Sequence, residues 1–225
     1  MHDDLRRSAA HVLVADVDDP ILDGPTEHHV RRVLRLRNGA TVTVTDGVGH
    51  WRTCRLVGAG LNVDGDVVGE AAASSPVTVG VAMPKGERSD WLVQKRTEVG
   101  VDRIVVLMAA RSVVRWDDAR ARHHLERLRR ITLEASLQAR RVWFPRIEGP
   151  RPAVEVLPGA VLAEPGGRPL RRSDDTVAVG PEGGWSPDEL AVGGDRVDLG
   201  PHVLRVETAA VVAASQLVAL HRISP

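Results

Sequence analysis

Two stretches in the last third of the chain each join a short apolar segment to a helix start through a turn rich in glycine and proline. The first reads VAVGPEGGWSPDEL over residues 177–190. Its opening residues suit a strand covered on both faces, and its glycines permit positive φ and close approach of a ligand to the backbone. Ser186, Pro187 and Glu189 match the N-cap, N1 and N3 positions of a capping box. The pattern predicts strand, turn and helix in that order.

The second stretch, VDLGPHVLRVETAA over residues 197–210, repeats this organisation. Its first three residues predict a strand, Gly200-Pro201 predicts a turn, and Thr208 is expected to cap a helix that runs to about His221. In open α/β sheets, ligands bind where the strands end. Two such turns close together in sequence therefore predict one shared ligand site.

The 225 residues divide by pattern into two domains. Residues 1–72 hold short alternating segments, such as TVTVT at 41–45 before the hairpin signal Asp46-Gly47, and predict a small β domain. Residues 73–225 alternate apolar, strand-like segments with longer helical ones. This alternation predicts an α/β domain with a mainly parallel sheet and helices on both faces.

Composition narrows the class of protein. Cys54 is the only cysteine, so an internal disulfide is excluded and a reducing cytoplasm is the expected compartment. No apolar run is long enough to span a bilayer, so we expect no membrane partner. The histidine pairs at 28–29 and 123–124 are adjacent and stand without a cysteine cluster, which argues against a metal site. The formal net charge is zero, which gives no global support for nucleic-acid binding.

The motifs GPEGGWSPDEL and LGPHVLRVETAA resemble the C-terminal signature of the SPOUT methyltransferases, and more narrowly that of the ribosomal RNA small subunit methyltransferase E family. PKGERSDWLVQKRTEVGVDRI at 84–104 and EASLQARR at 134–141 extend the resemblance through most of the second domain. The resemblance implies a deep trefoil knot in that domain, a PUA-like barrel in the first, and a homodimer formed through the knotted domain. It also implies methyl transfer from S-adenosyl-L-methionine to N3 of a decoding-region uridine in 16S rRNA of the small ribosomal subunit.

The same resemblance assigns the cofactor to the two turns and to the strand expected at residues 161–164. The implied cofactor-binding residues are Leu162, Glu164, Gly180, Pro181, Glu182, Gly183, Gly184, Leu199, Gly200, Val203, Leu204, Thr208 and Ala209.

Two side chains are the catalytic candidates. Arg205 is expected to stabilise the uridine anion, because a guanidinium stays charged and can bind a carbonyl oxygen. Glu207 is either the base that removes the N3 proton or a partner that holds Arg205. His202 stands where the family usually has arginine, which leaves the role of this position open.

RNA contacts are expected from basic residues in both domains. The helix predicted at residues 25–36 carries clustered histidine and arginine, which form either a solvated face or a contact with RNA phosphates. The candidate RNA-binding residues are Arg6, Arg7, His29, Arg31, Arg32, Arg35, Lys85, Lys95, Arg111 and Arg140.

Two other functions compete with this interpretation. A SPOUT methyltransferase could instead modify another RNA position, such as a ribose 2′-oxygen, or act on tRNA. A non-catalytic RNA-binding factor in ribosome assembly would keep the fold and would not bind the cofactor.

Overall fold

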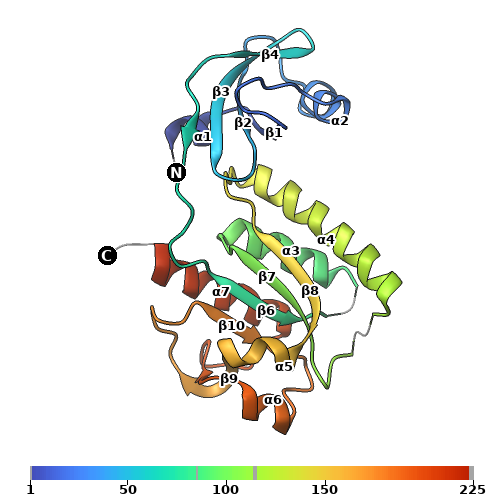
Figure 1. Cartoon of the computed structure of the whole chain (residues 1–225), viewed down its shortest axis with the longest axis vertical. Helices are drawn as coiled ribbons and strands as arrows, with labels where there is room; N and C mark the ends of the chain where they lie inside the picture. The colour runs from blue at the N-terminus through green and yellow to red at the C-terminus, as the bar shows by residue number, and fades with distance from the viewer. Residues whose placement is uncertain (1, 85, 114–115, 223–225) are drawn as a thin grey trace. The chain divides into compact units, whose positions relative to one another are not determined.

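The computed structural model describes residues 2–84, 86–113 and 116–222, with Asp118 described by its backbone alone. By its internal contacts the chain forms two compact units, which are drawn in Figure 1. The first comprises residues 1–73 and 136–144, and the second comprises residues 74–135 and 145–225. The expected division at residue 72 assigned 136–144 to the second domain, whereas the contacts of this segment group it with the first unit.

The first unit is built on a five-stranded sheet in the order β1-β2-β3-β4, with β5 paired to β3. Its elements are α1 (Asp3–Arg7), β1 (Ala10–Leu13), α2 (Gly24–His28), the π-helix η1 (His29–Val33), β2 (Thr41–Thr45), β3 (His50–Val57), β4 (Gly60–Val63) and β5 (Val68–Gly69). The hairpin predicted at Asp46-Gly47 joins β2 to β3, which pair antiparallel. The helix predicted at 25–36 is divided between α2 and η1.

The alternating segment TVTVT is buried on both faces, which its pattern did not predict. Val42 and Val44 enter the core of the unit, and Thr43 and Thr45 are also fully buried. The cover on the threonine face includes the returning segment 136–144: His11 Nδ1 lies 2.8 Å from Thr43 Oγ1, and its Nε2 lies 3.0 Å from the Arg141 carbonyl oxygen. A contact made across so many residues leaves no local signal in sequence.

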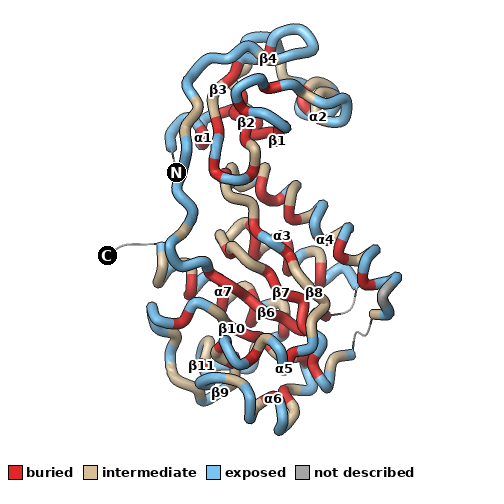
Figure 2. Tube along the Cα trace, in the orientation of Figure 1, coloured by how far each residue is buried: buried red, intermediate tan, exposed pale blue. Residues whose placement is uncertain are grey.

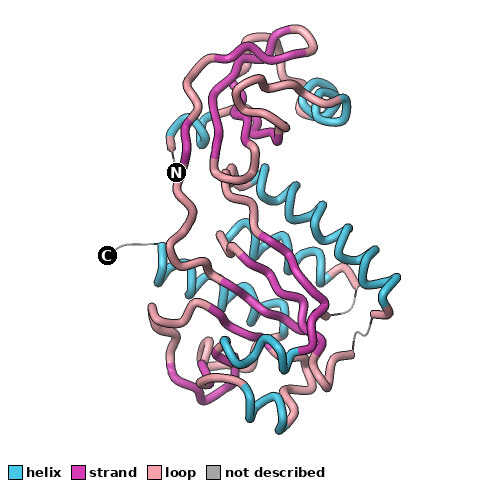
Figure 3. Tube along the Cα trace, in the orientation of Figure 1, coloured by secondary structure: helices cyan, strands magenta, loops and turns pink. Residues whose placement is uncertain are grey.

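The second unit contains one six-stranded sheet in the order β11-β9-β10-β6-β7-β8, and every pair in it is parallel (Figures 1 and 3). Its strands are β6 (Thr78–Ala82), β7 (Arg103–Met108), β8 (Arg146–Pro152), β9 (Val161–Arg168), β10 (Thr176–Val179) and β11 (Arg196–Val197). Its helices are α3 (Arg88–Val99), α4 (Asp118–Gln138), whose end lies in the first unit, α5 (Ala153–Val156), the 3-10 helix η2 (Leu157–Gly159), α6 (Pro187–Val192) and α7 (Val206–Arg222). The predicted parallel α/β architecture is confirmed.

Helices cover both faces of this sheet, and alternate strand residues show it. Ile104 and Val106 of β7 pack in the cluster that contains residues of α3, α4 and α7. Val105 and Leu107 pack in the opposite cluster with α5, η2 and Trp185. The central strands are accordingly buried along their length, as Figure 2 shows. Strands covered on both faces read as continuous apolar runs, and that is how these segments appear in the sequence.

Two predicted boundaries are wrong. α7 begins at Val206, so Thr208 lies inside its first turn and is not the N-cap. The strand expected to end at Glu164 continues as β9 to Arg168, because Gly166 adopts φ +79° and the strand bends instead of stopping. A Cβ at Gly167 would lie 2.5 Å from the Arg196 carbonyl carbon, so glycine permits close approach of β11.

His11 gives the first unit a testable pH dependence. Burial is the main reason why the pKa of His11 is lowered from 6.5 to about 4; the hydrogen bond to the Arg141 carbonyl opposes this shift, and the positive charge of Arg140 adds to it. The unfolded chain therefore binds a proton between pH 6.5 and 4 that the folded chain excludes. Stability should be unaffected by His11 above pH 6.5 and should fall by roughly 2 to 3 kcal/mol as pH drops to about 4.5.

The measurement is an NMR titration of the His11 ring, together with urea unfolding of the wild type and of His11→Gln. Unfolding is compared at a pH above 6.5 and at about pH 4.5. The stability of the wild type should fall more than that of the variant on acidification. A His11 ring that titrates near pH 6.5, or equal acid sensitivity of the two proteins, would contradict the burial argument.

Candidate functional site

The GPEGG turn follows β10, which lies between β9 and β6 in the sheet. The Gly184 N–H donates to the Pro181 carbonyl at 2.8 Å and closes the turn, with Gly184 at φ +69°. Trp185 is buried beneath it, and a Cβ at Gly180 would lie 2.9 Å from the indole Cε2. Glycine at 180 therefore serves packing against Trp185, whereas Gly184 serves the backbone conformation.

The predicted capping box at the start of α6 is confirmed. The Ser186 Oγ accepts from the Glu189 N–H at 3.3 Å, and a Glu189 carboxylate oxygen accepts from the Ser186 N–H at 2.8 Å. The second oxygen of Glu189 accepts from the Ala110 N–H at 2.7 Å. Because Ala110 follows β7, this buried carboxylate ties together the loops that leave two strands of the sheet.

Arg111 strengthens the same junction. Its Nη1 donates to the Gly183 carbonyl at 3.1 Å, and a Cβ at Gly183 would lie 3.3 Å from the Arg111 Cβ. The sequence suggested Arg111 as an RNA contact. In the structure it lies against the GPEGG turn and supports it.

The second stretch is joined to the bend in β9 by a carboxylate that sequence reasoning missed. Asp198 accepts hydrogen bonds from the N–H of Gly200 at 3.0 Å and from the N–H of Gly166 at 2.9 Å. These backbone donors lower the pKa of Asp198, with Gly200 the larger contributor. The only sequence signal was an acidic residue two positions before a glycine, which is typical of many turns.

Arg88, the first residue of α3, connects the two stretches. Its Nη1 lies 3.8 Å from a carboxylate oxygen of Glu182 in the GPEGG turn and 3.6 Å from Glu207 Oε1 in α7. Such half-exposed ion pairs contribute little to stability, but the geometry brings both predicted motifs into one cluster. Arg88 was not among the predicted site residues, because its partners are about 95 and 120 positions away in the chain.

Glu207 has an uncommon environment within this cluster. Its side chain is 13% exposed, and its Oε2 is buried without a hydrogen-bond partner among the described residues. A buried carboxylate oxygen without a donor is costly and marks a site with a reason to keep it. The ion partner of Glu207 is Arg88, and the exposed Arg205 side chain makes no ion pair within the described ranges. The interpretation that Glu207 only holds Arg205 therefore has no contact to support it.

The other expected cofactor-binding residues fall into two groups. Leu162, Pro181 and Ala209 are buried, and Leu162 packs with Trp185 in the core, so its side chain is not available to a ligand. Glu164, Leu199 and Leu204 are half-buried, and Val203 and Thr208 are exposed at the surface around Gly200 and Arg205. Val203 is 89% exposed, which is high for an apolar residue.

The expected RNA-binding residues are not equally free to contact RNA. Arg31 donates to the carbonyl oxygens of Leu36 and Gly58 and so holds its own loop. Arg140 donates to the Ser8 carbonyl at 2.8 Å. Both residues have a structural role within the first unit.

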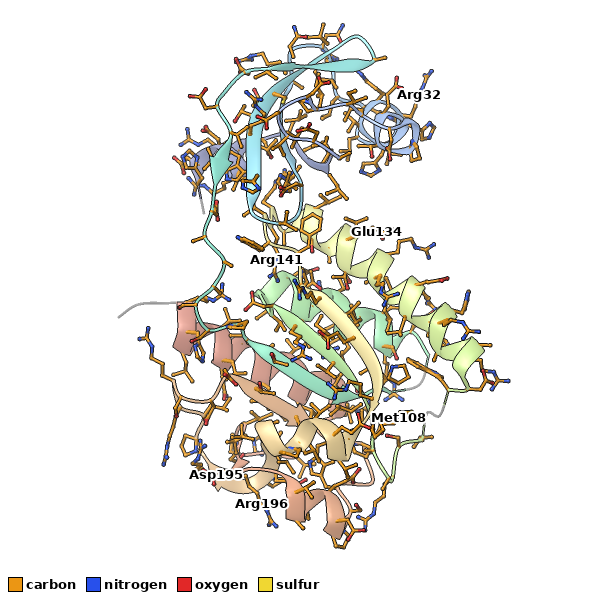
Figure 4. The ribbon with its side chains drawn as sticks, viewed as in Figure 1. Arg32, Met108, Glu134, Arg141, Asp195 and Arg196 are labelled. Carbon is orange, nitrogen blue, oxygen red and sulfur yellow. The ribbon has the colours of Figure 1, made fainter. Side chains whose placement is uncertain are left out.

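The remaining basic candidates differ in their pairing. Arg6 and Arg7 lie 2.9 and 3.6 Å from Asp3 on exposed α1, and Lys95 lies 2.8 Å from Glu98 on α3. His29, Arg32 and Arg35 are exposed at the end of α2 and around η1, and Figure 4 labels Arg32. Lys85 lies outside the described residues.

The described part of the chain contains neither a candidate membrane span nor a candidate metal cluster. None of its helices is long and apolar enough to cross a membrane. No group of three or more histidine, cysteine, aspartate or glutamate side chains within the same residues is arranged to hold a metal ion.

Comparison with known proteins places this geometry in a family. The family model described as an RNA methyltransferase domain matches residues 72–218, and the one described as an RNA methyltransferase PUA domain matches residues 22–62. Ribosomal RNA small subunit methyltransferase E of Mycobacterium bovis is 36% identical over 218 residues, which cover 86% of this chain and 83% of that protein. The Synechocystis protein of the same name is 30% identical over 217 residues, which cover 86% of this chain and 70% of that protein.

Solved structures agree with the sequence relatives. A probable rRNA methyltransferase from Porphyromonas gingivalis is 27% identical, with a TM-score of 0.75 over 94% of this chain and 98% of that one. A putative methyltransferase from Legionella pneumophila, solved with the bound cofactor SAM, is 26% identical, with a TM-score of 0.78 over 95% of this chain and 98% of that one. The matches confirm the expected fold, a SPOUT-type α/β domain preceded by a PUA-like β domain. The chain belongs to the ribosomal RNA small subunit methyltransferase E family of RNA methyltransferases.

Proposed function

We propose that this protein transfers a methyl group from S-adenosyl-L-methionine to N3 of a decoding-region uridine in 16S rRNA of the small ribosomal subunit. Membership of the family supports RNA methyltransferase activity. The observation that carries the proposal furthest is the Arg88 cluster, in which one guanidinium contacts a carboxylate from each of the two glycine-turn stretches. Through Arg88, this cluster brings the glycine-rich turn close to the largely buried carboxylate of Glu207.

The glycine positions fit a nucleoside-containing ligand. A Cβ built at Gly184 or Gly200 would meet no protein atom within 4 Å, so the backbone at both positions borders open space. Their φ angles of +69° and +151° also exclude most side chains. The backbone of Gly183, Gly184 and Gly200 can pair with the polar edges of adenosine, and exposed Val203 can cover its apolar surface.

Two side chains supply what uridine N3 needs. When bound, S-adenosyl-L-methionine supplies a methyl group activated by the positive charge on sulfur. N3 carries a proton in neutral uridine and becomes a good nucleophile only when that proton leaves. Glu207 is the proposed acceptor of this proton, because its buried Oε2 has no other donor among the described residues. Arg205 is proposed to stabilise the negative charge that develops on the carbonyl oxygens beside N3.

Nucleoside analysis tests the reaction directly. The purified protein is incubated with methyl-labelled S-adenosyl-L-methionine and with small ribosomal subunits from bacteria that lack the modification. The rRNA is then digested and its nucleosides are separated by mass spectrometry. We expect label in 3-methyluridine from 16S rRNA. Label in a ribose-methylated nucleoside would retain the methyl transfer but refute the N3 target, and binding of subunits without cofactor binding would favour the assembly factor.

Kinetics of single variants test the two catalytic roles. Glu207→Gln keeps the shape and removes the proton acceptor, so turnover should fall by about 10²–10⁴-fold while cofactor affinity, measured by calorimetry, stays within about threefold. Arg205→Ala should likewise lose turnover more than cofactor affinity. Glu155→Gln is the matched control, because the Glu155 side chain is exposed on α5, and it should behave as wild type. Parallel losses of turnover and affinity in Glu207→Gln would show that Glu207 serves binding or folding and not proton transfer.

RNA contact by the first unit is a separate part of the proposal. Arg32 and Arg35 are exposed around η1, so replacing both by alanine should weaken RNA binding and reduce the slope of log affinity against log salt by about 1 to 2. Arg55→Ala is the control, since Arg55 is exposed and paired with Asp64 at 2.9 Å. An unchanged slope in the double variant, measured by fluorescence anisotropy, would mean that this face is only solvated.

The homodimer expected through the second domain stays a prediction. Sedimentation of the purified protein checks it, and a monomer at micromolar concentration would refute it.

A further inference from the structure

A pocket of about 440 Å³ opens in the second unit beside the Arg88 cluster. Its walls come from the end of β6, the start of α3, the loop after β7 and the first half of α4. The residues that line it are Pro84, Gly86, Ser89, Asp90, Val113, Trp116, Arg120, His124, Arg127 and Leu128. This volume lies in the range of roughly 300–1,000 Å³ that is typical of small-ligand sites. The lining residues lie outside the GPEGG and LRVETAA stretches, so this is a different surface from the cofactor site proposed above.

Aromatic rings form one side of the pocket. The Trp116 indole and the His124 imidazole are stacked, with ring centroids 4.6 Å apart and planes 14° from parallel. Both side chains are only half-buried, so part of the pair remains accessible. Accessible aromatic rings bind nucleic-acid bases by stacking. Because the chain has no tyrosine and one phenylalanine, tryptophan and histidine supply most of its aromatic rings.

The charges of the pocket favour an anionic group. Arg127 forms an ion pair with Asp90, so the charges of these two side chains largely cancel. Arg120 has a 73% exposed side chain, and its ion partner among the described residues is Asp117, 3.5 Å away and itself 63% exposed. An exposed and loosely paired arginine beside an aromatic face matches a base together with its phosphate.

The pocket also adjoins the proposed site in sequence and space. Ser89, whose Oγ donates to the Pro84 carbonyl at 2.7 Å, forms part of the wall. The residue before it is Arg88, which contacts Glu207. A polynucleotide that presents one uridine to Glu207 would therefore pass close to this pocket.

We propose that this pocket binds one nucleotide of the RNA that flanks the methylated uridine, with its base stacked on Trp116 and its phosphate paired with Arg120. This inference rests on the proposed function, because it assumes an RNA substrate. It assigns the pocket a role in positioning the target and none in the chemical step.

Photo-crosslinking tests the contact with Trp116. A short single-stranded RNA of the decoding-region sequence, with 5-iodouridine on either side of the target uridine, is irradiated with the full-length protein. Trypsin cleaves after Arg115 and Arg120 and releases residues 116–120 as one peptide. We expect the crosslinked nucleotide on this peptide, at Trp116. Crosslinks confined to other peptides would overturn the inference.

Matched arginine variants test the phosphate contact. Arg120→Ala should weaken binding of the same RNA by about five- to tenfold, because one phosphate contact is lost. Arg122→Ala, two residues further along α4 and about 200° around the helix, should stay within about twofold. Equal weakening by both variants would show that only net charge matters and would refute a defined pocket.

A third readout separates this inference from the proposed function. If the wild type methylates N3 of uridine in small subunits but shows neither the Trp116 crosslink nor the Arg120 selectivity, the pocket inference fails and the function stands. If the crosslink and the selectivity appear but no 3-methyluridine forms, the pocket binds RNA and the proposed reaction is wrong.

Discussion

The candidate site depends on one buried carboxylate, that of Glu189. It is 2% exposed, yet it accepts hydrogen bonds from the backbone of Ser186 and of Ala110. These two hydrogen bonds link the loop that contains Ser186 to the loop that contains Ala110. One of these loops leaves β7 and the other leaves β10. This link sets the position of the GPEGG turn, which follows the carboxyl end of β10.

Around that fixed turn the site is assembled from parts with different physical roles. Gly180 packs against the buried Trp185 ring, and Arg111 donates a hydrogen bond to the Gly183 carbonyl in the turn. Asp198 links the loop after β11 to the bend in β9 through the Gly166 N–H. Arg88 then carries a positive charge between Glu182 and Glu207. The result combines a turn held by hydrogen bonds with one carboxylate oxygen, Glu207 Oε2, that lacks a hydrogen-bond donor among the described residues. This is an arrangement suited to the proposed binding of a nucleoside and acceptance of a proton.

Local sequence signals predicted the parts of the fold that depend on neighbours in the chain. The capping box at Ser186 and the Asp46-Gly47 hairpin follow from rules that span only a few residues. The parallel sheet was predicted on the same basis, because a continuous apolar run is a local signal of a strand that is covered on both faces. These signals needed no knowledge of the tertiary structure.

Contacts between residues far apart in the chain could not be predicted from the sequence. Arg88 pairs with Glu207, His11 lies within hydrogen-bond distance of the Arg141 carbonyl oxygen, and Arg31 donates to the Gly58 carbonyl oxygen. A basic or acidic residue in the sequence carries no mark of which partner it will meet. Strand boundaries failed where glycine allowed a bend at Gly166, because the same residue is also typical of a turn that ends a strand.

In the proposed cofactor site, the GPEGG turn and the LRVETAA stretch bind one ligand beside Glu207. A crystal structure of the protein with S-adenosylhomocysteine would test this arrangement. We expect the ligand to lie against the backbone of residues 180–184 and 199–204, with its sulfur on the side of Glu207. Density for the ligand at any other place, or ordered ligand contacts with only one of the two stretches, would show that the two stretches do not form one site.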